Sequence, residues 1–157
     1  MRVSYAPDDP MLPAILRTLK VSEGARELRQ VGDLLNTSQL VREYLQRIHG
    51  EDTQEQTGTL FLNARNRLIR HEPDIYRGTL DRAVVEPREI LKRALLCNAA
   101  GIIVYHNHPS GDPAPSREDR EFTRRLATAA DLLGIRLLDH LVVGGAASVS
   151  FLELGLL

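Results

Sequence analysis

A short apolar run at residues 102–105 constrains the fold more than any other segment. The run reads Ile-Ile-Val-Tyr, directly follows Gly101, and is flanked on both sides by segments with helical periodicity. A continuous apolar strand of this kind is buried on both of its faces, as in sheets that helices cover. The run therefore predicts an interior strand of an α/β protein.

The remaining periodicities predict the elements around this strand. We expect a helix from Ser38 to Gly50, strands over 57–63 and 67–71, a helix starting at Pro87, a helix over 116–133, and strands over 135–143 and 148–151. This order predicts a three-layer-like α/β sandwich, in which helices flank a mixed, partly antiparallel sheet. Residues 1–49 are expected to form an N-terminal arm and a helix that packs on the domain, and residues 50–157 the domain itself.

Composition excludes several classes of protein. Twenty Lys and Arg residues balance 21 Asp and Glu residues, so the chain lacks the basic excess that drives non-specific nucleic-acid binding. The lone Cys97 cannot form an internal disulfide, and we expect it to be a small buried residue. The first twenty residues contain neither a signal peptide nor a membrane span. We therefore expect a cytoplasmic protein.

Polar residues cluster directly after the apolar strand, in the segment His106-Asn107-His108-Pro109-Ser110-Gly111. Successive strand residues point to opposite faces, so His106 and His108 project to the same face and can both reach one metal ion. Asp119 falls in the first turn of the following helix, which can bring its carboxylate back over the strand end. Three protein ligands leave a position for water, as in catalytic zinc sites. His106, His108 and Asp119 are therefore predicted to bind Zn2+.

Simpler interpretations compete with this one. A single His after a strand is usually a hydrogen-bonded surface or core residue. The sequence Ser116-Arg117-Glu118-Asp119 also fits a capping box, which would account for both its Ser and its Asp without a metal. The loop over 109–115 favours the metal interpretation, because its three prolines and one glycine give it a stiff shape that a mere connector does not need. The HNH nucleases are a poor match, since their motif residues are separated by long intervals, and a zinc nucleoside deaminase would need Pro-Cys-x-x-Cys ligands that are missing.

The wider pattern resembles the JAMM (MPN-plus) metalloprotease signature. Glu55 is followed by His106-x-His108-Pro109, and then by Ser116-x-x-Asp119 at the spacing of that signature. More narrowly, four segments resemble the JAMM domain of RadC-type proteins over residues 50–157; they are Pro87-Arg88-Glu89-Ile90, His106 to Gly111, Pro115-Ser116 and Leu138-Asp139-His140. The chain looks like a short, free-standing version, without the helix-hairpin-helix region that precedes this domain in full-length RadC proteins.

The resemblance implies a cytidine-deaminase-like α/β fold and a role for each matched residue. His106, His108 and Asp119 would bind zinc. Ser116 would help to hold the oxyanion of the tetrahedral intermediate, and Glu55 would be the general base. This chemistry is self-consistent, because zinc lowers the pKa of a coordinated water to about 7 and a neighbouring carboxylate can then take the proton.

The position of the general base depends on the start of the first strand. Glu55-Gln56-Thr57-Gly58 precedes that strand as the family's Glu-x-x-Gly does, whereas Glu51 and Glu72 are weaker candidates. From the sequence without the family, Glu55 would be a solvated loop carboxylate.

Asp139 and His140 form a further polar pair on an apolar strand. The simpler interpretation is a hydrogen-bonded pair that fixes the edge of the sheet. Because RadC-type chains carry the same Leu-Asp-His, the alternative is support of the metal ligands or contact with the substrate. We do not count the pair as catalytic.

We therefore expect a zinc-dependent metallopeptidase or isopeptidase that acts on a protein or peptide substrate. One alternative is a metal-dependent DNA-processing or DNA-repair-associated protein, since RadC names are historically attached to DNA repair and zinc hydroxide can also attack phosphate. The neutral charge balance argues against it. Another is a binding module without catalysis, but such MPN domains typically lose ligands that this chain retains. Asn107 stands where many JAMM deubiquitinases have Ser or Thr, so ubiquitin-like substrates do not follow from the resemblance.

Overall fold

The computed structural model describes residues 34–48, 56–77 and 86–157. Within these ranges the elements are α2 (Ser38–Ile48), β1 (Gln56–Leu62), β2 (Leu68–Arg77), α3 (Pro87–Leu96), β3 (Gly101–Asn107), α4 (Arg117–Leu132), β4 (Arg136–Gly144) and β5 (Ala147–Ser150). Each predicted helix and strand is present in the order expected. The largest difference is β2, which continues past the predicted end at residue 71 to Arg77. Residues 1–33 of the predicted N-terminal arm lie outside the described residues.

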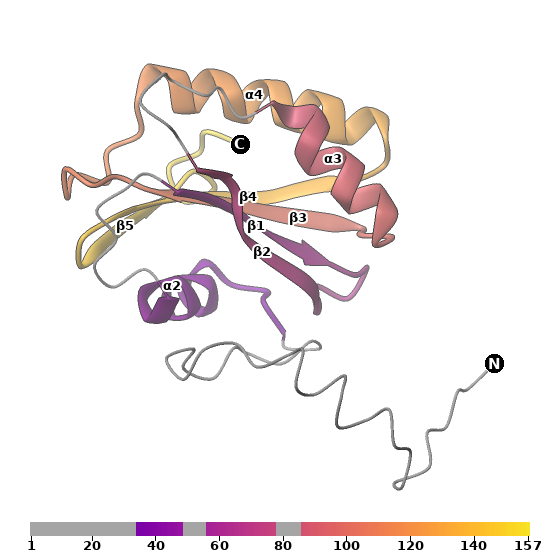
Figure 1. Ribbon diagram of the computed structural model, residues 1–157, viewed down its shortest axis with the longest axis horizontal. Helices are drawn as coiled ribbons and strands as arrows, with labels where there is room; N and C mark the ends of the chain where they lie inside the picture. Colours follow the sequence, from indigo (N-terminus) through magenta and orange to yellow (C-terminus); the bar gives the residue numbers. More distant parts are fainter. Residues whose placement is uncertain (1–33, 49–55, 78–85) are drawn as a thin grey trace, which may run out of the picture.

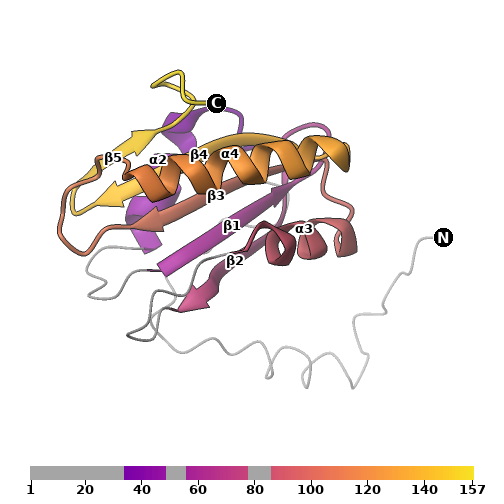
Figure 2. The same cartoon turned by 90° about the horizontal axis from the view of Figure 1, so that it is seen from above.

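The five strands form one mixed sheet in the order β2-β1-β3-β4-β5. The pairs β1–β2, β1–β3 and β4–β5 are antiparallel, and β3–β4 is parallel. The parallel pair requires a crossover connection, and α4 provides it (Figure 2). The mixed, partly antiparallel sheet predicted from the sequence is confirmed.

Helices cover both faces of this sheet (Figure 1). The central strand β3 is buried along its whole length and sends alternate residues to two separate cores. Ile102 and Val104 belong to the core under α3 and α4, whereas Ile103 and Tyr105 belong to the core under α2. By the same alternation His106 lies on the face that α3 and α4 cover.

Helix α2 is packed into the fold through its apolar stripe. Val41, Tyr44 and Leu45 are all buried and lie in one cluster with residues of β1, β3 and β4. Burial of each such side chain contributes about 1.5–3 kcal/mol to the free energy of unfolding. The lower face of the sheet in Figure 1 therefore depends on α2 for its cover.

Two further expectations concern single features. Cys97 lies at the C-terminal cap of α3 and is half-buried, so its predicted burial is correct only in part. In the described residues, none of the helices has both the length and the hydropathy to span a bilayer.

Candidate metal centre

The two histidines of the predicted site lie together at the end of β3. His106 is the penultimate residue of the strand and is 4% exposed. His108 continues the extended path, because its N–H donates to Val143 O at 2.7 Å. The rings consequently share one face, with 2.9 Å between the two Nε2 atoms.

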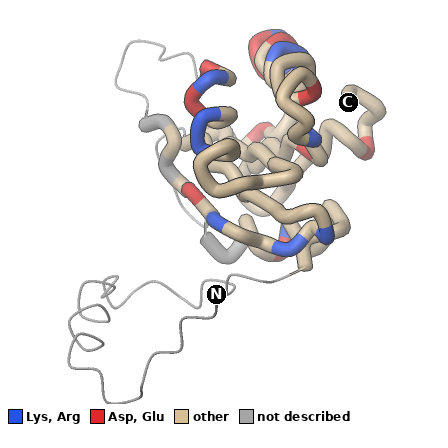
Figure 3. The backbone as a smooth tube through the Cα atoms, turned by 90° about the vertical axis from the view of Figure 1, so that its right-hand side faces the viewer, with Lys and Arg blue, Asp and Glu red and all other residues tan. Residues whose placement is uncertain are grey.

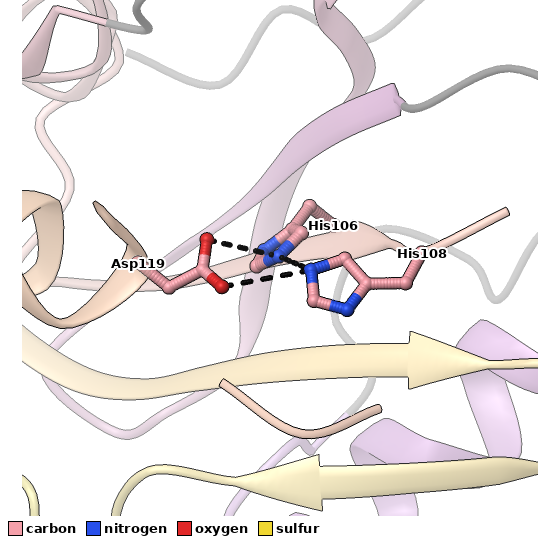
Figure 4. Close-up of side chains that lie close together, drawn as sticks. All are labelled: His106, His108 and Asp119. Atoms are coloured by element: carbon pink, nitrogen blue, oxygen red, sulfur yellow. Dashed lines mark hydrogen bonds and ion pairs between the residues drawn. The ribbon is translucent and has the colours of Figure 1, made fainter. Parts of the chain in front are cut away.

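Asp119 reaches the same point from α4. Ser116 is the N-cap of this helix, and the reciprocal hydrogen bonds of a capping box hold Asp119 in the first turn. Asp119 Oδ1 lies 3.2 Å from His106 Nε2, and Asp119 Oδ2 lies 3.5 Å from His108 Nε2. Figure 4 shows the three side chains pointing toward one another. The capping box predicted from the sequence is confirmed, and it does not prevent the carboxylate from facing the histidines.

The spacing of these atoms fits a small tetrahedral cation. One ligand atom from each of the three residues can be chosen so that all lie within 4.8 Å of one another. Two ligands bound to zinc at 2.0–2.1 Å and at the tetrahedral angle are separated by about 3.3–3.4 Å. The observed separations of 2.9, 3.2 and 3.5 Å scatter around that value. Two imidazoles and a carboxylate are also a donor set that zinc accepts.

The loop after β3 fixes the orientation of His108. His108 Nδ1 lies 2.8 Å from Asp112 O, and a carbonyl oxygen only accepts, so Nδ1 carries the proton and Nε2 is free to bind a cation. Gly111 has a φ of +81°, in the left-handed region that favours glycine. Gly144 allows close packing of this loop, since a Cβ there would be 2.6 Å from Gly111 O and from Pro113 N. The shaped loop expected from the prolines and glycine is thus packed against β4.

The environment adjusts the protonation of the site. Burial by itself raises the pKa of the Asp119 carboxyl, but hydrogen bonding and charge from His106, together with hydrogen bonds from Ser116, outweigh it and lower that pKa below its usual range. Asp119 is therefore ionised at neutral pH. Burial, reinforced by the charge of His106, lowers the pKa of His140 to about 3.

His140 contacts the candidate ligand His106, a support that the sequence indicated only as an alternative. His140 is 1% exposed, and its Nε2 lies 2.9 Å from His106 Nδ1. Its neighbour Asp139 points to the opposite face, where Ser38 and Ser150 donate hydrogen bonds to its carboxylate. The two side chains thus act separately, and their strand is interior to the sheet rather than at its edge. Strand alternation in the Leu-Asp-His segment signals only that the two side chains face opposite ways, whereas the contact with His106 comes from the pairing of β3 with β4.

The predicted general base, Glu55, lies outside the described residues, as does Glu51. The next residue in the chain, Gln56, donates its N–H to Asn107 Oδ1 at 2.7 Å. Thr57 is paired with His106 in the β1–β3 ladder. The beginning of β1 is therefore fixed beside the two histidines.

Glu72, the other weaker candidate, forms ion pairs that account for its carboxylate. Its oxygens lie 2.6 Å from Arg70 and 2.7 Å from Arg93. The contact with Arg93 joins β2 to α3, whereas Arg70 lies in the same strand as Glu72, and both contacts indicate a structural role.

The Ser116 hydroxyl is engaged within the capping box. It accepts the N–H of Asp119 at 3.0 Å and donates to Asp119 Oδ2 at 2.7 Å. An oxyanion would compete with Asp119 for the same hydrogen, so the oxyanion role of Ser116 stays a prediction.

The fold and this cluster together define an α/β domain of the JAB/MPN type. The model of the family described as RadC-like JAB domain matches residues 35–156, and the chain belongs to this family. The matched range begins before α2, which agrees with the packing of that helix into the core.

Relatives at 41–50% identity carry names that assign no activity. A UPF0758 protein of Thiobacillus denitrificans is 50% identical over 126 residues, which cover 80% of this chain and 56% of the relative. A UPF0758 protein of Leptothrix cholodnii is 50% identical over 124 residues, or 79% and 55% of the two chains. The chain thus spans little more than half the length of these relatives. The UPF0758 protein YfjY of Escherichia coli is 41% identical over 162 residues, covering 100% of this chain and 99% of the relative.

Proposed function

We propose that this protein is a zinc-dependent metallopeptidase or isopeptidase. The observation that carries the proposal is the convergence of His106 Nε2, His108 Nε2 and the Asp119 carboxylate, with 2.9–3.5 Å between neighbouring atoms. These three residues would hold the ion. When bound, zinc supplies Lewis-acid activation of water and of a substrate carbonyl group.

The protein's own residues would provide the rest of the chemistry. Glu55 would accept a proton from the attacking water and return it to the leaving amine, as a general base and then a general acid. Support for this role comes from Asn107, which anchors the N–H of the following residue, Gln56, next to His106. Ser116 would donate its hydroxyl hydrogen to the oxyanion, once that hydrogen leaves Asp119 Oδ2.

The charge distribution gives less support to the DNA-processing alternative. Basic and acidic residues are interspersed along α3 and α4, the two helices at the top of Figure 3. A phosphate backbone would favour a stripe of one sign. We propose a protein or peptide substrate for this reason, together with the formal net charge of -1.

The test is cleavage of a defined substrate pool by the parent protein and a His108→Ala variant. Both would be incubated with zinc and a proteome-derived peptide library that includes lysine-isopeptide-linked members, and new amino termini would be identified by mass spectrometry. Single-stranded and duplex DNA would be tested in parallel. We expect peptide or isopeptide cleavage that needs zinc and is lost in His108→Ala. Cleavage of DNA alone, lost in the same variant, would overturn the proposal in favour of the DNA-processing alternative.

A further inference from the structure

We infer that His140 is a positioning residue that, together with Thr123, fixes the proton of His106 on Nδ1 and so leaves Nε2 bare toward the metal centre. This inference rests on the proposed metal site. The three residues come from β3, α4 and β4 and form a continuous chain of hydrogen bonds behind the ligand.

The hydrogen-bond chain starts at the backbone carbonyl of Asp119, which can only accept a hydrogen bond. Thr123 Oγ1 lies 2.6 Å from Asp119 O, the carbonyl four residues earlier in α4. A carbonyl oxygen has no hydrogen, so the Thr123 hydroxyl must donate at this distance. Its single hydrogen is then committed to Asp119.

The next contact determines the tautomer of His140. Thr123 Oγ1 also lies 2.6 Å from His140 Nδ1. Because the hydroxyl hydrogen already points to Asp119, the hydrogen of this second contact belongs to His140 Nδ1. The ring is 1% exposed, and its nitrogens face a hydroxyl and an imidazole, so it is held in the neutral form with a bare Nε2.

The last contact transfers this assignment to the candidate ligand. His140 Nε2, being bare, accepts from His106 Nδ1 at 2.9 Å. In its neutral form His106 therefore carries its proton on Nδ1, and its Nε2 presents a lone pair to His108 and Asp119. In the neutral form of His108 the proton likewise lies on Nδ1, so with both rings neutral no hydrogen occupies the 2.9 Å between the two Nε2 atoms. A cation is the partner that satisfies this contact.

The hydrogen-bond chain also connects two of the candidate metal ligands, Asp119 and His106. Thr123 donates to the backbone carbonyl of Asp119, and His140 accepts from the ring of His106. Hydrogen-bond partners of metal-binding histidines fix the tautomer and the ring orientation, and their loss typically lowers metal affinity by about 10–100-fold. We expect this range for variants that break the chain.

Thr123→Val is the sharpest test, with Thr128→Val as its matched control. Both hydroxyls donate to the carbonyl four residues earlier in α4, at 2.6 and 2.9 Å, but Thr128 is exposed. Two variants of His140 complete the set: Gln can both accept from His106 and donate to Thr123, whereas Phe can do neither. Phe retains an aromatic ring to stack on Phe151, which lies 4.6 Å from His140 between ring centroids.

The first readout needs no metal. Long-range 1H–15N correlation spectra of the chelated protein at neutral pH would show which nitrogen of His106 and of His140 carries hydrogen. We expect Nδ1–H on both rings in the parent and in Thr128→Val, and a substantial Nε2–H population on His106 in Thr123→Val and His140→Phe. A parent protein with Nε2–H on His106 would overturn the inference, whether or not the protein is a peptidase.

The second readout is zinc affinity, measured by competition with a chromophoric chelator. Thr123→Val and His140→Phe should bind zinc about 10–100-fold more weakly than the parent, whereas His140→Gln should recover most of the loss. Equal zinc affinity of Thr123→Val and Thr128→Val would contradict the positioning role. Failure of the parent to bind zinc would instead refute the proposed function and leave the spectra to decide the tautomers.

Discussion

The Ser116 hydroxyl accepts the backbone N–H of Asp119 at 3.0 Å and donates to the Asp119 carboxylate at 2.7 Å. The same carboxylate faces His106 and His108 at 3.2 and 3.5 Å. The capping and metal-binding interpretations of the sequence are therefore compatible. One hydrogen-bonded pair begins α4 and also aims the acid at the histidines.

Ser116→Ala should weaken both functions of this pair. Loss of an N-cap side chain costs about 1 kcal/mol, which urea unfolding of the metal-free protein would measure. Zinc affinity and turnover should also fall, since Asp119 Oδ2 loses a hydrogen-bond donor. Thr128→Ala, which removes an exposed hydroxyl further along the same helix, is the control and should leave zinc affinity and turnover unchanged. A Ser116→Ala protein with parental stability and activity would show that neither role is real.

Metal content tests the ligands directly. The purified parent should contain about one zinc per chain, removable by chelators. His106→Ala and His108→Ala should lose the metal, because each removes one of three protein ligands. Asp112→Asn is the control: it alters an exposed acid of the same loop but keeps the oxygen that accepts from Ala114 N. Full stability and activity of metal-free parent protein would contradict this prediction.

Local patterns predicted most of the fold and the three candidate ligands. The apolar run at 102–105 and the capping residues of α4 are local signals, and the structure contains β3 and α4 at those positions. The contact between His140 and His106 depends on the parallel pairing of β3 with β4, which no local pattern encodes. The same holds for Glu72, whose role follows from contact with Arg93 of α3. β2 continues past its predicted end at residue 71 although Pro73 follows. An edge strand tolerates a proline, and β2 lies at the edge of the sheet.

Gly144→Ala should change the orientation of the His108 ring indirectly, through the loop that packs against Gly144. The added Cβ would lie 2.6 Å from two backbone atoms, Gly111 O and Pro113 N, so the loop must move. That loop supplies Asp112 O, the acceptor of His108 Nδ1–H. We expect weaker zinc binding, measured by chelator competition, and a folded protein by circular dichroism. Gly134→Ala, where nothing lies within 4 Å, is a control for the loss of a glycine but carries the strain of its φ of +68°. Parental zinc affinity in Gly144→Ala would contradict the role of the loop.

The metal-free protein should lose stability as the pH falls below about 6.5. Burial and the charge of His106 lower the pKa of His140 from 6.5 to about 3, so in this range the unfolded chain binds a proton that the folded chain does not. The contribution of His140 to the free energy of unfolding is complete above the pKa of this residue in the unfolded chain. Below that pKa it declines by up to about 1.4 kcal/mol per pH unit. Asp119 is ionised in both states until the pH nears 3.8, so it adds nothing over most of this window.

Urea unfolding between pH 7 and pH 5 in the presence of a chelator would measure how steeply the free energy of unfolding changes with pH. His140→Gln removes the titrating group, so this slope should fall by the equivalent of about one bound proton. An equal slope in the parent and in His140→Gln would show that another group is responsible.

The last prediction separates Glu55 from the metal ligands. A general base contacts water and not the ion, so Glu55→Gln should retain zinc and fold but lose about 10²- to 10⁴-fold in turnover. Asn107→Ala should act in the same direction more weakly, since it removes the acceptor that anchors Gln56 N–H, whereas Asn107→Asp keeps an acceptor oxygen.

Glu51→Gln and Glu118→Gln are the matched controls and should be nearly silent. Glu72→Gln should lower stability rather than turnover, because it weakens the ion pairs with Arg70 and Arg93. Zinc content, urea unfolding and single-turnover rates would be compared for all variants on a peptide that the parent cleaves. If Glu55→Gln keeps the parental rate while Glu51→Gln loses it, the base is Glu51 and the metal site is unaffected. If both keep it, the proton is taken by another group, and Asn107 serves only to fix the start of β1.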